Sequence, residues 1–151
     1  MSASKTASRA MVGLVAGGTA AGAVVVDALL PETARQHMRN PRWPAHAKFH
    51  NAQYIVMSAL LGGLGLRLLS SPHGDPDHNR VLATAIVSVP HVGMFGAAAF
   101  PGTALSDEEF SDSPANTVKG VEVNLLSASI CLAVLGASLA LGRGRRPGRQ
   151  R

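Results

Sequence analysis

Two histidines and a glutamine occupy one face of a predicted helix. His46, His50 and Gln53 are spaced i, i+4 and i+7, which places their side chains in one stripe along a helical face. Imidazole groups are suited to proton transfer near neutral pH. We therefore predict that His46 and His50 donate protons or orient water, and that Gln53 holds a substrate oxygen.

Carboxyl groups in two other apolar stretches are the candidate bases or nucleophiles. Asp27 lies near the end of the first stretch, and Glu122 lies near the start of the last one. Ionisable groups inside a bilayer are costly and are functional candidates by default. Glu122 and Asn124 lie about 200° apart by the helical period. Only one of them can point into the centre, and we predict that Glu122 does.

A further histidine lies deeper in the third apolar stretch. Thr84 and Ser88 share a helical face with His91. His91 follows Pro90 and could instead bond backbone carbonyls that a proline kink sets free. This structural role is the alternative to substrate binding.

The polar groups of separate stretches are expected to meet. If both chain termini lie on one side of the membrane, these groups gather near the other side, and we predict one pocket there. The predicted catalytic residues are His46, His50, Glu122 and Asp27. The predicted substrate-binding residues are Gln53, Asn51, Trp43, His91 and Asn124.

Each candidate also has a simpler interpretation. Asp27 is three residues from its expected helix end and could reach water, and Glu122 could stabilise the first turn of a helix. His46 could lie among lipid headgroups. His50 and Gln53 could hydrogen-bond a neighbouring helix.

Metal chemistry is a weaker interpretation of the same residues. Two histidines at i and i+4 with a carboxylate could hold zinc or iron. Residues 46–50 lack the Glu that follows the first His of a zinc-protease helix. A haem between His50 and His91 would find no clear pocket among Gly-rich helices with few aromatics. We therefore predict chemistry without a metal or cofactor.

Four apolar stretches would have to position these groups. A spanning helix needs roughly 20 mostly apolar residues, and such stretches lie at about residues 10–30, 46–69, 81–100 and 118–142. Only 15% of the residues are charged, against about 25% in soluble domains. We predict an all-α, four-helix transmembrane bundle in one domain. It comprises residues 1–142 and is followed by a basic, disordered tail, residues 143–151.

The first stretch could instead be a secretory signal. Lys5 and Arg9 precede it, and Ala21-Gly22-Ala23 resembles a cleavage site. The apolar run continues to Leu30, beyond the roughly 7 to 15 residues of a signal's apolar region. We therefore predict that it is retained as a membrane anchor.

Basic residues predict the orientation and the partners. Five arginines lie in residues 143–151, and Lys5 and Arg9 lie near the other terminus. The positive-inside rule then predicts an inner-membrane protein with both termini cytoplasmic, whose tail contacts anionic lipids. No signature for base recognition accompanies these arginines, which argues against nucleic acid. The acidic loop 102–117 could pair with the arginines of loop 31–45.

Small residues in every stretch favour close helix packing. They are Gly13, Gly17, Gly18 and Gly22, then Gly62, Gly63 and Gly65, then Gly93 and Gly96, and finally Ser127, Ser129 and Gly136. These residues predict a compact bundle. The same faces could form a homodimer, and the sequence does not separate the two uses.

The segment from Trp43 to Gln53, Trp-Pro-Ala-His-Ala-Lys-Phe-His-Asn-Ala-Gln, resembles a motif of small four-span membrane proteins of bacteria and fungi. Some similar fungal proteins resemble the membrane epoxide hydrolases of polyketide pathways. The resemblance implies a site at His46, His50 and Gln53, supported by Trp43 and Asn51. It also implies a polyene-derived epoxide as the substrate.

We therefore predict a membrane enzyme that uses acid and base catalysis on a lipophilic small molecule in a natural-product pathway. The expected type is an epoxide hydrolase, cyclase or isomerase. Two alternatives remain open at this point. One is a non-catalytic subunit or small transporter that conducts protons or ions through the same groups. The other is a structural partner protein that uses its glycine faces.

Overall fold

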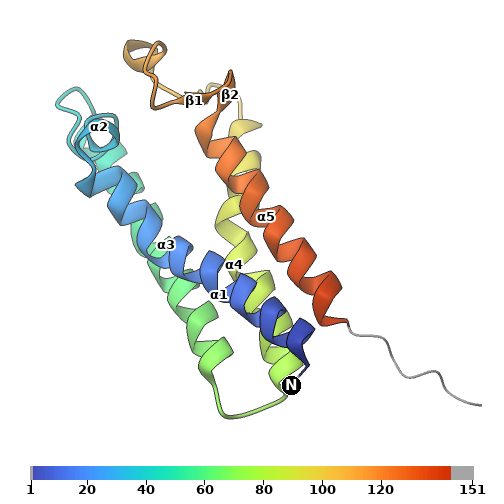
Figure 1. Cartoon of the computed structure of the whole chain (residues 1–151). Helices are drawn as coiled ribbons and strands as arrows, with labels where there is room; N and C mark the ends of the chain where they lie inside the picture. The colour runs from blue at the N-terminus through green and yellow to red at the C-terminus, as the bar shows by residue number, and fades with distance from the viewer. Residues whose placement is uncertain (1, 144–151) are drawn as a thin grey trace, which may run out of the picture.

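The computed structural model describes residues 2–143, and four long helices dominate it (Figure 1). These are α1 (Ala3–Val24), α3 (Ala45–Ser70), α4 (Pro76–Ala98) and α5 (Val123–Gly142). A π-helical turn, η1 (Val25–Leu29), continues α1. Each of the four is long and apolar enough to cross a membrane, so the predicted all-α four-helix bundle is confirmed, and the chain fits a multi-pass membrane protein.

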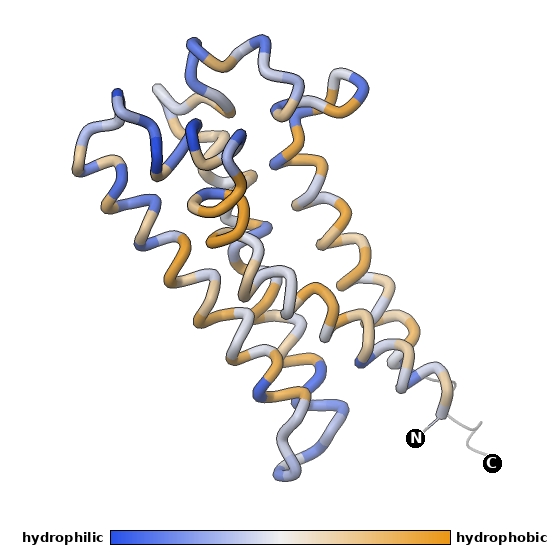
Figure 2. The backbone as a smooth tube through the Cα atoms, turned by 60° about the vertical axis from the view of Figure 1, so that its left-hand side comes forward, coloured by the Kyte–Doolittle hydropathy of each residue, from blue (hydrophilic) through white to orange (hydrophobic). Residues whose placement is uncertain are grey.

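Hydrophilic residues gather at both ends of the bundle (Figure 2). The N-terminus of α1 and the end of α5 lie at the same end (Figure 1). We call the other end, formed by residues 30–44 and 99–122, the loop end. It holds the short helices α2 (Pro31–Ala34) and η2 (Glu108–Phe110). The predicted disordered tail lies outside the described residues, apart from Arg143.

The fourth spanning helix begins later than predicted. Residues 118–122 are not helical, because β1 (Thr117–Val118) and β2 (Val121–Glu122) pair as an antiparallel hairpin. Lys119 and Gly120 form its two-residue loop with φ of 53° and 80°, the positive values that a type I′ turn requires. The helix therefore begins at Val123 rather than at about Val118.

The third spanning helix, α4, begins earlier than predicted because Asp75 caps its N-terminus. Asp75 Oδ1 accepts the backbone N–H groups of Asp77 at 2.6 Å and His78 at 3.0 Å. Pro76 occupies the first helical turn, where its missing N–H costs nothing. This N-cap extends the helix five residues before the expected Val81.

The bundle is tightly packed away from the loop end. Its buried core consists of Val12, Val15, Ala16, Ala83, Val87 and Leu135. At Gly62 a Cβ would collide with the backbone of Ala16 and Ala20, and at Gly65 it would collide with Val87. These two glycines therefore serve close helix contacts, as predicted. A Cβ at Gly17, Gly18, Gly22, Gly63, Gly93, Gly96 or Gly136 would meet nothing within 4 Å.

Two buried serines join α1 to α5 in this packed half. Ser8 Oγ donates to the Ser138 carbonyl at 2.8 Å, and Ser138 Oγ donates to the Ser8 carbonyl at 3.1 Å. Both residues are fully buried. Reciprocal hydrogen bonds of this kind hold helices together in lipid, where apolar burial contributes little between them.

Polar contacts join the two segments of the loop end. Arg42 forms an ion pair with Glu109, whose other oxygen accepts from Asn40 at 2.9 Å. Trp43 Nε1 donates to Asp107 at 2.7 Å. The expected pairing of the acidic loop with an arginine of the other loop is thus confirmed.

Candidate binding cavity

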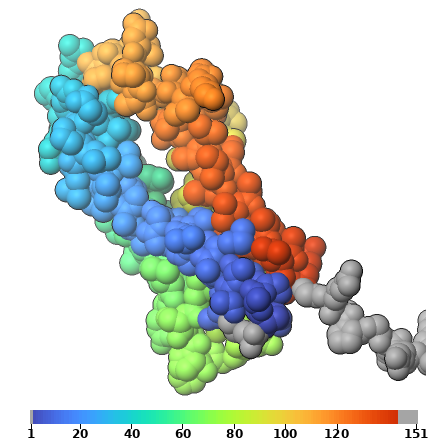
Figure 3. Space-filling model, in the orientation of Figure 1, coloured from blue at the N-terminus to red at the C-terminus, as the bar shows by residue number. Residues whose placement is uncertain are grey.

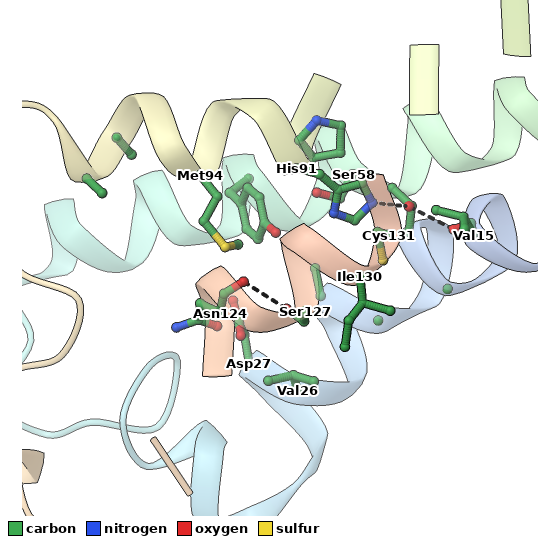
Figure 4. Close-up of a pocket in the computed structure, with 18 of the residues that line it drawn as sticks. Val15, Val26, Asp27, Ser58, His91, Met94, Asn124, Ser127, Ile130 and Cys131 are labelled. Atoms are coloured by element: carbon green, nitrogen blue, oxygen red, sulfur yellow. Dashed lines mark hydrogen bonds between the residues drawn. The ribbon is translucent and has the colours of Figure 1, made fainter. Parts of the chain in front are cut away.

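A cavity of about 760 Å³ lies between the four long helices toward the loop end. Figure 3 shows the hollow between α1 and α5, and Figure 4 shows the side chains around it. Most of its surface is apolar. Its polar lining side chains include Thr19, Asp27, His37, Asn51, Tyr54, Ser58, His91 and Asn124.

The π-helical turn places a buried carboxyl group on the cavity wall. Asp27 is only 7% exposed, and its Oδ1 lies 3.8 Å from His37 Nδ1. His37 Nδ1 also lies 2.8 Å from the Thr33 carbonyl, which can only accept, so this nitrogen carries a proton. In the neutral ring, Nε2 is then free to accept a proton. Single π-helical turns are frequent at functional sites.

One face of α3 supplies three more polar groups. Asn51, Tyr54 and Ser58 follow i, i+3 and i+7 spacing and all line the cavity. The side-chain nitrogen of Asn51 and the hydroxyl of Ser58 are buried. Asn51 faces Asp27, and Ser58 faces Tyr54. The polar groups of α3 thus converge on the carboxyl group of η1.

His91 contacts α1 across the cavity. Its Nε2 lies 3.2 Å from Thr19 Oγ1, and that hydroxyl donates to the Val15 carbonyl at 2.8 Å (Figure 4). Because the Thr19 proton is engaged, His91 Nε2 is the donor, and its Nδ1 is an acceptor in the neutral ring. The histidine thus bonds a neighbouring helix rather than a carbonyl freed by Pro90.

The expectation that Glu122 points into the centre is wrong. Glu122 is the N-cap of α5, and its carboxylate accepts the Leu125 N–H at 2.9 Å and the Asn124 amide at 2.8 Å. Asn124 lines the cavity instead, as Asp27 does (Figure 4). The hairpin before Val123 explains the difference, because it leaves Glu122 outside the helix.

The polar stripe of α3 also lies outside this cavity. His46, His50 and Gln53 are exposed and are not among its lining residues. His46 and His50 join through their Nε2 atoms at 3.0 Å, and His50 Nδ1 lies 3.3 Å from Gln53 Oε1. Successive helical residues differ by about 100°, so Asn51 faces inward while His50 does not. The structure does not form the single pocket predicted for the imidazoles and both acids, and a catalytic role for His46 and His50 stays a prediction.

Trp43 lies beside the main cavity. It packs edge-on against the His37 ring, with centroids 5.6 Å apart, and both residues line a smaller cavity of about 240 Å³. Of the predicted site residues, the main cavity contains Asp27, Asn51, His91 and Asn124.

Four of the polar cavity residues, Thr19, His37, Tyr54 and Ser58, were not among the predicted site residues. The spacing of Tyr54 and Ser58 from Asn51 was visible in the sequence and could have identified this second face of α3. No local pattern identifies His37. It reaches Asp27 only because the chain reverses after Leu30, where the Met38 N–H donates to the Asp27 carbonyl at 3.3 Å.

Comparison with known proteins gives one match. No curated protein and no solved structure is significantly similar to the chain. A family model matches residues 11–151, which is most of the sequence. The chain therefore belongs to DUF6640, a family of unknown function.

Proposed function

We propose that the protein is a membrane-embedded enzyme that acts on a lipophilic small molecule by acid and base catalysis. The observation that carries this proposal is the buried Asp27 carboxyl beside His37, in the wall of a largely apolar cavity. Small-molecule sites are typically apolar cavities with a few convergent polar groups.

The shape of the cavity supports entry from the lipid. The hollow between α1 and α5 lies on the side of the bundle (Figure 3), and Thr103, Ala104 and Leu105 of the loop end also line the cavity. Leu14, Val26 and Ile130 are among its apolar lining residues. A substrate dissolved among acyl chains would find a similar apolar surface there.

Opening of an epoxide is the most specific version of this function. Asp27 would take a proton from water as the water oxygen attacks a ring carbon. The carbon–oxygen bond of the ring would break, and the Tyr54 hydroxyl would protonate the released oxygen. Transfer of the proton from Asp27 back to Tyr54 would restore both groups and leave a diol. The resemblance of residues 43–53 to the fungal proteins motivates the choice of an epoxide, but the positions that it implies, His46, His50 and Gln53, lie outside the cavity. Of that segment, Asn51 would hold the substrate oxygen.

Conduction of protons or ions is the rival function. A conduction path must continue to the far side of the membrane. The buried apolar core around Ala16, Val87 and Leu135 lies in the half of the bundle away from the loop end, and the buried Ser8, Ser138 and Arg80 of that half are packed between the helices. This packing favours a closed binding site over a conduction path.

Purified protein in proteoliposomes tests the proposal with a panel of polyene and terpene epoxides, by measuring diol formation. We expect Asp27→Asn to lower turnover about 10²- to 10⁴-fold, the usual contribution of a general base, and Tyr54→Phe to lower it as well. Glu32→Gln is the matched control, because Glu32 is an exposed carboxylate near Asp27 in the chain. Unchanged turnover in Asp27→Asn would refute the enzyme. A proton flux that depends on Asp27 would support the transporter instead.

The membrane and its lipids are part of the proposal. Lys5, Arg9 and Arg67 belong to the end of the bundle away from the loop end, where α5 also finishes at Gly142. We assign this end to the cytoplasmic side of an inner membrane, in contact with anionic lipids.

A further inference from the structure

The exposed histidine pair of α3 has the geometry of a metal-binding site. We propose that His46 and His50 bind a divalent transition-metal ion, with Cu²⁺ or Ni²⁺ preferred. The proposal concerns a surface outside the cavity and does not depend on the proposed enzyme function.

The two ring nitrogens are close enough for one ion to bind both. Their Nε2 atoms lie 3.0 Å apart. An ion about 2.05 Å from each nitrogen would hold them about 2.9 Å apart at a 90° ligand angle, and about 3.3 Å apart at a tetrahedral angle. The observed spacing lies between these two values, so one ion can reach both nitrogens. Imidazole nitrogens bind Cu²⁺ and Ni²⁺ more tightly than the earlier divalent ions of the first transition row.

Gln53 contacts the His50 ring, and Phe49 packs beside the His46 ring. Gln53 Oε1 lies 3.3 Å from His50 Nδ1 and can accept its proton, which leaves Nε2 of the neutral ring with a free electron pair. An acceptor behind a ligating histidine is the usual arrangement at metal sites. Phe49 lies parallel to the His46 ring, with centroids 6.3 Å apart and planes 7° apart.

The ion would replace the hydrogen bond that joins the rings. In the metal-free pair, His46 Nε2 donates to His50 Nε2. Binding requires the His46 proton to move to Nδ1, so that both Nε2 electron pairs bind the ion and the charge of each ring stays unchanged. Residues 2–143 contain no group of three or more His, Cys, Asp or Glu side chains that could hold a metal. The proposed site therefore has two protein ligands, with water in the other positions.

Titration of the full-length protein in detergent with Ni²⁺ and Cu²⁺ tests the site, after purification through a tag without histidine. We expect one ion per chain and a Cu²⁺ paramagnetic resonance spectrum with two equatorial nitrogens. His46→Ala and His50→Ala should each weaken binding at least tenfold and leave one nitrogen. Gln53→Ala should weaken binding about 10- to 100-fold, as losses behind a ligand commonly do.

His78→Ala is the matched control, because His78 is an exposed histidine of another helix, in the first turn of α4. It should leave binding unchanged. The altered α3 side chains are exposed, so helical content measured by circular dichroism should match the wild type. The same affinity and spectrum in wild type and both α3 histidine variants would overturn the proposal, as would loss of the ion only in His78→Ala.

Discussion

The contact between α1 and α3 at Gly62 permits a quantitative test of the packing. A Cβ at this position would lie 2.5 Å from the Ala16 carbonyl oxygen and 2.8 Å from the Ala20 Cα. Non-bonded heavy atoms prefer about 3.5 Å or more, so Gly62→Ala would force the helices apart by up to about 1 Å. Because the obstructing atoms are backbone, no side-chain rotation relieves the clash. Overpacking of this kind costs about 1–3 kcal/mol.

Gly63 provides a matched control in the same helix. A Cβ there would meet nothing within 4 Å. Alanine is favoured over glycine inside a helix by about 0.5–1 kcal/mol, and this gain applies to both variants. The difference between them therefore isolates the packing cost. We expect Gly62→Ala to be about 1–3 kcal/mol less stable than Gly63→Ala.

Unfolding in mixed micelles of mild detergent and dodecyl sulfate measures this difference. Circular dichroism reports the helices, and fluorescence of Trp43, the single tryptophan of the chain, reports the loop end. Equal stability of the two variants would refute the close crossing of α1 and α3. Because Asn51 lies on α3 and Asp27 lies in η1, which continues α1, Gly62→Ala should also lower the proposed enzyme activity more than Gly63→Ala does.

Two further predictions concern single hydrogen-bonding groups. Ser8→Ala removes the α1 hydroxyl from the reciprocal pair with Ser138 and should destabilise the bundle by about 0.6–1.7 kcal/mol. In the same micelle assay, Ser129→Ala should change little, because Ser129 is exposed and bonds its own helix; equal losses in both variants would contradict a special role for the buried pair. The backbone N–H groups of His78 and Asp77 donate to Asp75 and hold its pKa below the ordinary value. The charged cap therefore contributes its full stabilisation above about pH 3.9. This contribution disappears as the pH falls through the lowered pKa. Asp75→Ser keeps a capping oxygen without the charge, so its stability deficit relative to wild type should shrink in acid, and a deficit independent of pH would contradict this account.

Local sequence properties determined the main architecture. The length and hydropathy of four stretches predicted the spanning helices, and α3 matches its predicted range within one residue at each end. Even the wrong start of the fourth helix has a local cause. Lys119 and Gly120 form the loop of a two-residue hairpin. Hydropathy alone nevertheless predicts that the flanking Val118 and Val121 belong to the apolar helix.

The tertiary structure decided which polar groups meet. In lipid the outward face of a helix is as apolar as the packed face, and apolar residues surround α3 with little bias to one side. The sequence pattern therefore identified the stripe of His46 and His50 but not its direction. Only the close crossing at Gly62 and the chain reversal after Leu30 place Asn51 and His37 beside Asp27. Those are contacts between segments distant in sequence, and no local propensity encodes them.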